Sequence, residues 1–301
     1  MKRKYLFSMF ILLMLLVVAC DSSESDSSSA DARDTFTYES ETGPVEVPTN
    51  PERIVALTNA PNVHALGGSL VGVDEWTMKN PLFKESLEDV EVVSESDPES
   101  ILAQDPDLII AGSHMENLEE LEKIAPTVIY TWGKLDYLEQ QLEIGKLLNK
   151  EEEAQDWIES FTQEAKETGD KIKETYGEDV SVSVFETDAK SFYVFGENWA
   201  RGTELLYQAM ELKMPQKVEE DALAEGSHQL SMEVLPEYAG DFIVISRSQS
   251  GDHGFLESDI WNSIPAVEHN QVIEIDTEAA TYSDPVTLEY LLDVFEKGFL
   301  E

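Results

Sequence analysis

Residues 149–177 read NKEEEAQDWIESFTQEAKETGDKIKETYG, and their pattern organises the rest of the chain. Apolar side chains recur here mainly at three- and four-residue intervals, which places them in one stripe along a helix. They are Ala154, Trp157, Ile158, Phe161, Ala165, Ile172 and Tyr176. Asn149, with Glu152 three residues later, can cap the start, and Gly177 is typical of a helix end. The stretch predicts a helix over 150–177, about 40 Å long at about 1.5 Å per residue.

Short aliphatic runs bounded by turn residues lie on both sides of this helix. They cover 54–57, 108–111 and 128–130 before it, and 180–185, 192–195, 242–245 and 272–275 after it. Continuous rather than alternating apolar runs indicate sheets covered on both faces. The sequence therefore predicts two α/β lobes, over 35–149 and 178–301. The helix between them suits a rigid backbone that allows only small lobe motion, although packing on one lobe alone fits the same periodicity.

The first twenty residues have the pattern of a secretory signal. Basic residues 2–4 precede an apolar run over 5–19, interrupted only by Ser8, which is shorter than the about 20 residues of a spanning helix. The sequence Val17-Val18-Ala19-Cys20 resembles the lipobox of bacterial lipoproteins, in which the cysteine is acylated and becomes the new N-terminus. The alternative is an ordinary signal peptide with an incidental thiol. We therefore predict a signal over 1–19 and a lipid anchor on Cys20 that holds the protein outside the cell membrane.

The composition constrains what the exported protein binds. Residues 21–34 are rich in Ser, Asp, Glu and Ala, so we interpret 20–34 as a disordered tether that begins at the lipidated cysteine. Cys20 is the only cysteine, which excludes an internal disulfide. The chain has 62 acidic and 20 basic residues, a net charge of −42. Nucleic acid and anionic lipid surfaces are therefore disfavoured partners, while a cationic ligand would be attracted. Adaptation to a saline or alkaline medium explains the excess of acidic residues more simply than a cation-binding role.

Signatures of the common enzyme classes are missing from the sequence. It contains no Gly-x-Ser-x-Gly, no His-Glu-x-x-His and no phosphate-binding loop, and no cysteine remains once Cys20 is acylated. Carboxylates are so frequent that no pair stands out as an acid/base couple. The five histidines are scattered without the spacing of a metal site: His64, His114, His228, His253 and His269. We predict a binding protein rather than an enzyme, with no protein-built metal site and no cofactor.

The segment 192–202, FYVFGENWARG, combines aromatic and basic side chains in an acidic chain. Trp199 and Arg201 follow an expected strand, where loops of open α/β sheets bind ligands. The arginine fork suits the anionic oxygens of a chelate, and tryptophan and tyrosine offer flat apolar walls. A surface arginine paired with one of the many acids, beside a core tryptophan, explains the residues equally well.

Several longer stretches resemble one known family. They are 123–128 KIAPTV, 137–141 YLEQQ, 196–202 GENWARG running into 206–210 LYQAM, 238–241 YAGD, and 282–288 YSDPVTL. The chain resembles the ferric hydroxamate siderophore-binding lipoproteins of Gram-positive bacteria, which serve iron-complex ABC transporters. The resemblance implies two Rossmann-like lobes of the class III periplasmic-binding-protein type, joined by a rigid helix, with a shallow pocket between them. The siderophore's own oxygens would fill the iron coordination shell, so the protein needs no metal ligands.

The resemblance also assigns residue roles. Arg201 is expected to donate to hydroxamate oxygens and Trp199 to pack against the chelate. The other implied lining residues are Tyr193, Tyr282, Trp132, Asn59 and Trp76. Trp132 stands where relatives carry a tyrosine and Thr281 where close relatives carry a tryptophan, which leaves the identity of the siderophore open.

The family docks on its permease through one acidic residue per lobe, which pairs with arginines of the membrane subunits. By position these residues are Glu99 and Glu233. We therefore predict an extracytoplasmic, monomeric solute-binding lipoprotein that delivers a ferric hydroxamate to an ABC permease.

Two alternatives remain. The same fold could bind haem, a corrinoid or a catecholate siderophore. Haem would require an axial ligand, for which His228 and Met78 are candidates. A lipid-anchored hydrolase is the other alternative, and no residue constellation supports it.

Overall fold

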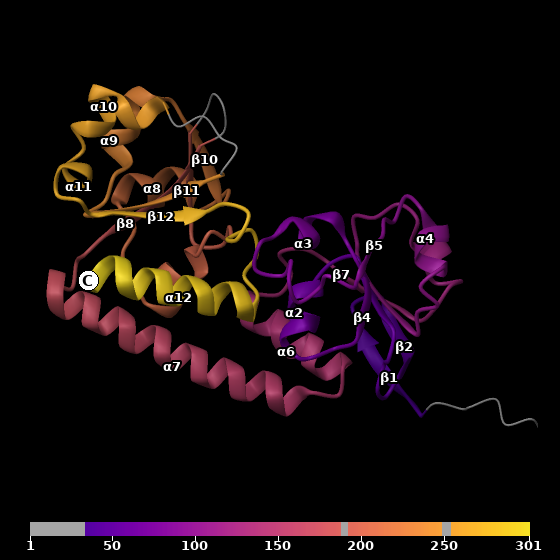
Figure 1. Ribbon diagram of the computed structural model, residues 1–301. Coiled ribbons are helices and arrows are strands. Elements are labelled where there is room, and N and C mark those ends of the chain that lie inside the picture. The colour runs from indigo at the N-terminus through magenta and orange to yellow at the C-terminus, as the bar shows by residue number, and fades with distance from the viewer. Residues whose placement is uncertain (1–33, 188–191, 249–253) are drawn as a thin grey trace, which may run out of the picture. The chain divides into compact units, whose positions relative to one another are not determined.

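The computed structural model describes residues 34–187, 192–248 and 254–301, and Asp34–Glu301 form one compact unit (Figure 1). The predicted signal over 1–19, Cys20 and nearly all of the tether over 20–34 lie outside the described residues. In the described part of the chain, none of the helices combines the length and apolar character that crossing a bilayer requires.

The first sheet of the unit is parallel throughout and has the strand order β5-β4-β3-β6-β7. Its strands are β3 (Ile54–Ala56), β4 (Leu70–Val73), β5 (Glu91–Val92), β6 (Leu108–Gly112) and β7 (Thr127–Tyr130). The strands predicted from the apolar runs are confirmed as β3, β6 and β7. A separate antiparallel hairpin precedes them, formed by β1 (Thr35–Ser40) and β2 (Gly43–Pro48).

The second sheet is mixed, with the order β10-β9-β8-β11-β12. Its strands are β8 (Val182–Thr187), β9 (Phe192–Phe195), β10 (Ser227–Leu230), β11 (Phe242–Arg247) and β12 (Val272–Asp276). Strands β8, β11 and β12 run parallel, whereas β9 is antiparallel to both of its neighbours. All four apolar runs of the second half are therefore confirmed as strands.

Both sheets bury both faces, as the continuous apolar runs predicted. Ile54 and Ala56 belong to one apolar cluster and Val55, between them, belongs to another. In the second sheet, Val184 and Phe185 likewise lie in different clusters. Because successive strand residues point to opposite faces, each sheet has an apolar layer on either side.

The predicted long helix is α7 (Glu151–Tyr176), and Gly177 follows it with φ 105°. The predicted capping role of Asn149 is wrong. Asn149 has φ 56° and donates its backbone N–H to Lys146 O, while Lys150 N–H bonds to Gly145 O at 2.7 Å. These two bonds close the end of α6 (Tyr137–Leu147) in a Schellman arrangement, which needs a left-handed residue that asparagine tolerates. Asn149 therefore ends one helix instead of starting the next.

The helix α7 contacts apolar clusters of both sheets. Ala154 in its first turn lies in a cluster with strands of the first sheet. Phe161, Ala165 and Ile172 lie in a cluster with strands of the second sheet. Most of the predicted stripe thus packs on the second sheet, and the first turn packs against α6. Figure 1 shows α7 running beneath α6 and the C-terminal helix α12 (Pro285–Leu300).

The remaining helices are short and connect the strands. They are α2 (Ala60–Ala65), α3 (Glu75–Lys79), α4 (Pro98–Leu102), α5 (Leu118–Leu121), the π-helix η1 (Glu204–Ala209), α8 (Gln216–Ala222), η2 (Met232–Val234), α9 (Leu235–Tyr238), η3 (Gly254–Glu257), α10 (Asp259–Asn262) and α11 (Pro265–Glu268).

Candidate functional site

A cavity of about 630 Å³ lies between the two sheets. From the first half of the chain it is lined by residues that follow β3, β6 and β7, where the carboxyl ends of parallel strands meet. From the second half it is lined by the segment 198–201, by Glu204 and by the segment 281–284 before α12. Five of the residues predicted from the sequence line it: Asn59, Trp132, Trp199, Arg201 and Tyr282.

Two tryptophans from opposite sides meet at this cavity. The rings of Trp132 and Trp199 lie edge to face, with centroids 5.9 Å apart and an interplanar angle of 87°. Trp199 also stacks on Phe195, and a Cβ on Gly226 would come within 2.5 Å of its ring. Trp132 is 79% exposed, so most of its indole surface is accessible to a ligand. The pair offers an aromatic wall whose polar N–H groups can still find acceptors.

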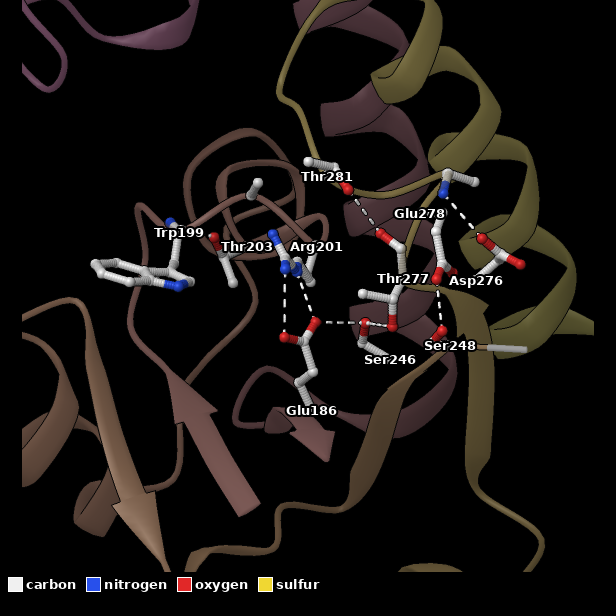
Figure 2. Close-up of polar contacts among 12 residues, drawn as sticks. Glu186, Trp199, Arg201, Thr203, Ser246, Ser248, Asp276, Thr277, Glu278 and Thr281 are labelled. Atoms are coloured by element: carbon white, nitrogen blue, oxygen red, sulfur yellow. Dashed lines mark hydrogen bonds and ion pairs between the residues drawn. The ribbon is translucent and has the colours of Figure 1, made fainter. Parts of the chain in front are cut away.

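The sequence left open whether Arg201 binds a ligand or pairs with an acid, and in the structure it lines the cavity and is also paired with an acid. It lines the cavity, and its Nε and Nη2 donate to the two carboxylate oxygens of Glu186 at 2.7 and 3.3 Å (Figure 2). Its backbone has φ 54° and donates to Ala280 O at 2.9 Å. Among the described residues no bond to Nη1 is formed, so this edge of the fork is available to a ligand.

Glu186 is a residue that sequence reasoning missed. Its Oε2 also accepts a hydrogen bond from Ser246 Oγ at 2.9 Å, and Ser246 Oγ lies 2.8 Å from Thr277 Oγ1. Glu186, Ser246 and Thr277 stand at the carboxyl ends of β8, β11 and β12, the three parallel strands of the second sheet. An acid at the end of the apolar run 180–185 was the available signal, but its partner is 15 residues away in sequence.

The loop with Arg201 reaches the cavity differently from the predicted strand-end loop. It follows β9, which is antiparallel to β8, so the end of β9 does not coincide with the carboxyl ends of the parallel strands. The chain returns to that edge through Ala200, Arg201 and Gly202, which all have positive φ. Non-glycine residues adopt this conformation at a cost, and such backbone is characteristic of ligand sites.

Two buried carboxyl groups also line the cavity. Burial raises the pKa of Asp284 to about 6, and burial raises the pKa of Glu204 as well. Asp284 caps α12 by accepting the backbone N–H groups of Val286 and Thr287. Glu204 accepts the backbone N–H of Ala200 at 3.1 Å. Both acids therefore hold the backbone of cavity-lining segments in place.

The side of the cavity next to the first sheet supplies amide groups. Asn59 has φ 55° and its side chain makes no capping bond to α2, so the amide is not committed to the helix. Asn62 donates to Gln141 Oε1 at 2.9 Å. Gln140 Nε2 is buried and, among the described residues, has no hydrogen-bond acceptor. Gln140 lies in the family-like stretch 137–141, and its unpaired donor makes it a candidate ligand contact that the sequence did not single out.

Two predicted lining residues are not among those that line the cavity. Tyr193 stands directly opposite Glu186 in the ladder between β8 and β9 and packs against an apolar cluster instead of lining the cavity. Trp76 is 68% exposed on α3, where Lys79 lies over its ring. Thr281, the second departure from the family, lines the cavity and donates to Thr277 O at 2.9 Å.

The candidate haem ligands lie elsewhere. His228 is on β10 and stacks on Tyr238, while Met78 packs against an apolar cluster of the first sheet. Neither lines the cavity. Across residues 34–187, 192–248 and 254–301, no three His, Cys, Asp or Glu side chains gather to hold a metal ion.

The two predicted docking acids are exposed. Glu99 lies in the first turn of α4 after the cap Asp97, and Glu233 lies in η2. Leu102, on the same helix as Glu99, is 60% exposed.

Comparisons with known proteins agree with this architecture. Residues 54–279 match the family model described as periplasmic binding protein. The iron(3+)-hydroxamate-binding protein FhuD of Bacillus subtilis is 34% identical over 294 residues, covering 94% of this chain and 93% of that protein. YxeB of the same organism, also an iron(3+)-hydroxamate-binding protein, is 33% identical over 308 residues, covering 97% and 95%.

Solved structures show the same fold. The structure of FhuD2 from Staphylococcus aureus with bound ferrioxamine B matches with a TM-score of 0.78 and 29% identity, covering 83% of this chain and 98% of that one. The predicted two-lobed fold of the class III type and the resemblance to ferric hydroxamate-binding proteins are confirmed by these matches.

Proposed function

Because this chain belongs to the periplasmic binding protein family, we propose that it captures a ferric hydroxamate siderophore outside the cell, as a monomer, and delivers it to an ABC permease. The observation that carries the proposal is the arginine and the two tryptophans that converge on one cavity. Arg201 keeps one edge of its fork free for hydroxamate oxygens, and Trp199 with Trp132 can pack on the organic part of the chelate.

The chemistry of the cavity suits an iron complex whose coordination shell is already full. Its lining offers amide, hydroxyl and indole donors and a single guanidinium, which can contact the outside of a chelate, beside the acids Asp136, Glu204 and Asp284. Iron bound directly by the protein would require several anionic or imidazole ligands in one place, and among the described residues no three His, Cys, Asp or Glu side chains gather in that way. The iron is therefore cargo carried by the siderophore, and the protein binds without catalysing a reaction.

The test is a titration of intrinsic fluorescence with chemically distinct ferric siderophores. A ferric trihydroxamate is expected to quench tryptophan emission and to saturate at one ligand per protein, because Trp132 and Trp199 both line the cavity. The Trp76→Phe variant is the matched control, since Trp76 lies away from the cavity and its loss should leave the titration midpoint unchanged. Absence of saturable quenching by any of several trihydroxamates would contradict the proposal.

We also propose that Glu99 and Glu233 contact the permease. Both are exposed in the first turns of short helices, where a carboxylate can reach an arginine of another subunit. Glu99→Ala combined with Glu233→Ala is expected to leave ligand quenching intact and to reduce siderophore-dependent iron uptake by about tenfold or more. The control pair is Glu88→Ala with Glu237→Ala, two exposed acids of the same two halves. Normal uptake by the test pair would rule out this docking role.

We further propose that acylated Cys20 anchors the protein to the membrane. The support is its position directly after the apolar run of the signal. Mass spectrometry of the detergent-extracted protein should find a diacylglyceryl group on residue 20, and a free thiol there would refute the anchor.

A further inference from the structure

The pairing of Arg201 with Glu186 affects which ligand charges the cavity accepts. This inference rests on the function proposed above. Among the described residues that line the cavity, Arg201 is the only lysine or arginine. Its charge would make the cavity attractive to anionic chelates if it stood alone. It does not stand alone, because both oxygens of Glu186 are bonded to its fork.

Glu186 is firmly held in that position. Ser246 is fully buried and donates its hydroxyl to Glu186 Oε2, and Thr277 lies next to the same hydroxyl (Figure 2). The side chains of Glu186 and Arg201 are only 19% and 18% exposed, so water screens the pair weakly. Neutralisation of the guanidinium is therefore a fixed feature of the site.

The other charged groups on the cavity wall are acidic. Asp136, Glu204 and Asp284 line it, and no second lysine or arginine of the described chain lines it to offset them. With Arg201 compensated by Glu186, an incoming ligand meets a wall that is neutral to negative. A multiply anionic chelate would lose its hydration there without gaining a net opposite charge.

We propose that Glu186 is a specificity-determining residue that makes the cavity select neutral or cationic ferric chelates and reject anionic ones. It acts in two ways. Its negative charge cancels that of Arg201, and its two hydrogen bonds occupy Nε and Nη2, which leaves Nη1 as the donor for a ligand. A neutral chelate uses this donor, whereas an anionic chelate meets the repulsion of the surrounding carboxylates.

The experiment compares two probes on one set of variants. The probes are a neutral ferric trihydroxamate and a trianionic ferric tris-catecholate, titrated by fluorescence at one pH and one ionic strength. Glu186→Gln keeps the side-chain length and removes the charge. It is expected to shift the ratio of the two affinities by about tenfold or more in favour of the anion. Glu274→Gln is the matched control, because it removes an acid paired with Arg247 in the same sheet and away from the cavity.

A second variant separates charge from positioning. Ser246→Ala leaves the charge of Glu186 and removes the hydroxyl that holds it, so it should weaken binding of the neutral probe without favouring the anion. It also keeps the proposal testable if Glu186→Gln folds poorly: a gain in anion affinity in Ser246→Ala would overturn it. If Glu186→Gln binds the trihydroxamate but has the same ratio of trihydroxamate to tris-catecholate affinity as the wild type, Glu186 does not determine specificity. That result would leave the proposed function intact. A wild-type protein that binds no trihydroxamate would instead contradict the proposed function.

Discussion

Replacing Arg201 by alanine is expected to weaken binding of a ferric trihydroxamate by about 100-fold, equivalent to about 2.7 kcal/mol. The loss is large because the ligand loses a charged hydrogen-bond donor, and because the mostly buried carboxylate of Glu186 is left without its partner. The unpaired carboxylate also repels electron-rich hydroxamate oxygens. Fluorescence titration of the variant, set against the wild-type protein, measures the change directly.

Two further variants test whether the loss comes from the guanidinium of Arg201. Arg201→Lys is expected to recover only part of the affinity, since an ammonium is a point charge and cannot bond Glu186 and a ligand through one planar fork. Arg247→Ala is the control: it removes an arginine ion-paired with Glu274 in the same sheet, away from the cavity, and should bind normally. Arg201→Ala binding within about threefold of wild type would show that the guanidinium does not contact the ligand.

Replacing Gly169 by alanine is expected to lower the free energy of unfolding by about 3 kcal/mol or more. Gly169 lies in α7 where the helix backbone approaches the end of η1. A Cβ on this residue would collide with the carbonyl oxygen of Met210 and lie 2.8 Å from its carbonyl carbon. Both partners are backbone in buried elements, so neither can move aside as a flexible side chain would.

Chemical denaturation at equilibrium measures this loss. The control is Gly67→Ala, where the added Cβ meets no atom within 4 Å and the cost is confined to the left-handed backbone, φ 67°, at about 1–2 kcal/mol. Equal destabilisation by the two variants would show that α7 can slide away from η1. In that case the helix would be a looser connection than its length and packing indicate.

The apolar runs predicted the strands because a strand buried on both faces presents mostly apolar side chains to two apolar layers. The few buried polar residues of these strands are hydrogen-bonded, as Ser183 of β8 is to Tyr238 O. The strands β4 and β5 were not predicted, because neither forms a continuous buried apolar run. The first is interrupted by Gly72, and the second has only two residues, both exposed. The long helix was recognisable from its stripe, but its exact start was not, because an asparagine can either begin a helix or end the one before it.

The sequence by itself determined the two α/β halves, the helix between them and the Trp199–Arg201 loop, because local apolar periodicity and a short run of aromatic and basic residues are properties of neighbours in the chain. Tertiary structure alone decided which residues surround that loop. Glu186 became the partner of Arg201, and Tyr193 packs against an apolar cluster instead of lining the cavity, where β8 pairs with β9. Glu186 follows an apolar run, but among 62 acids that position does not show that folding brings it within 2.7 Å of a guanidinium. The charge that the cavity presents to its ligand depends on that contact.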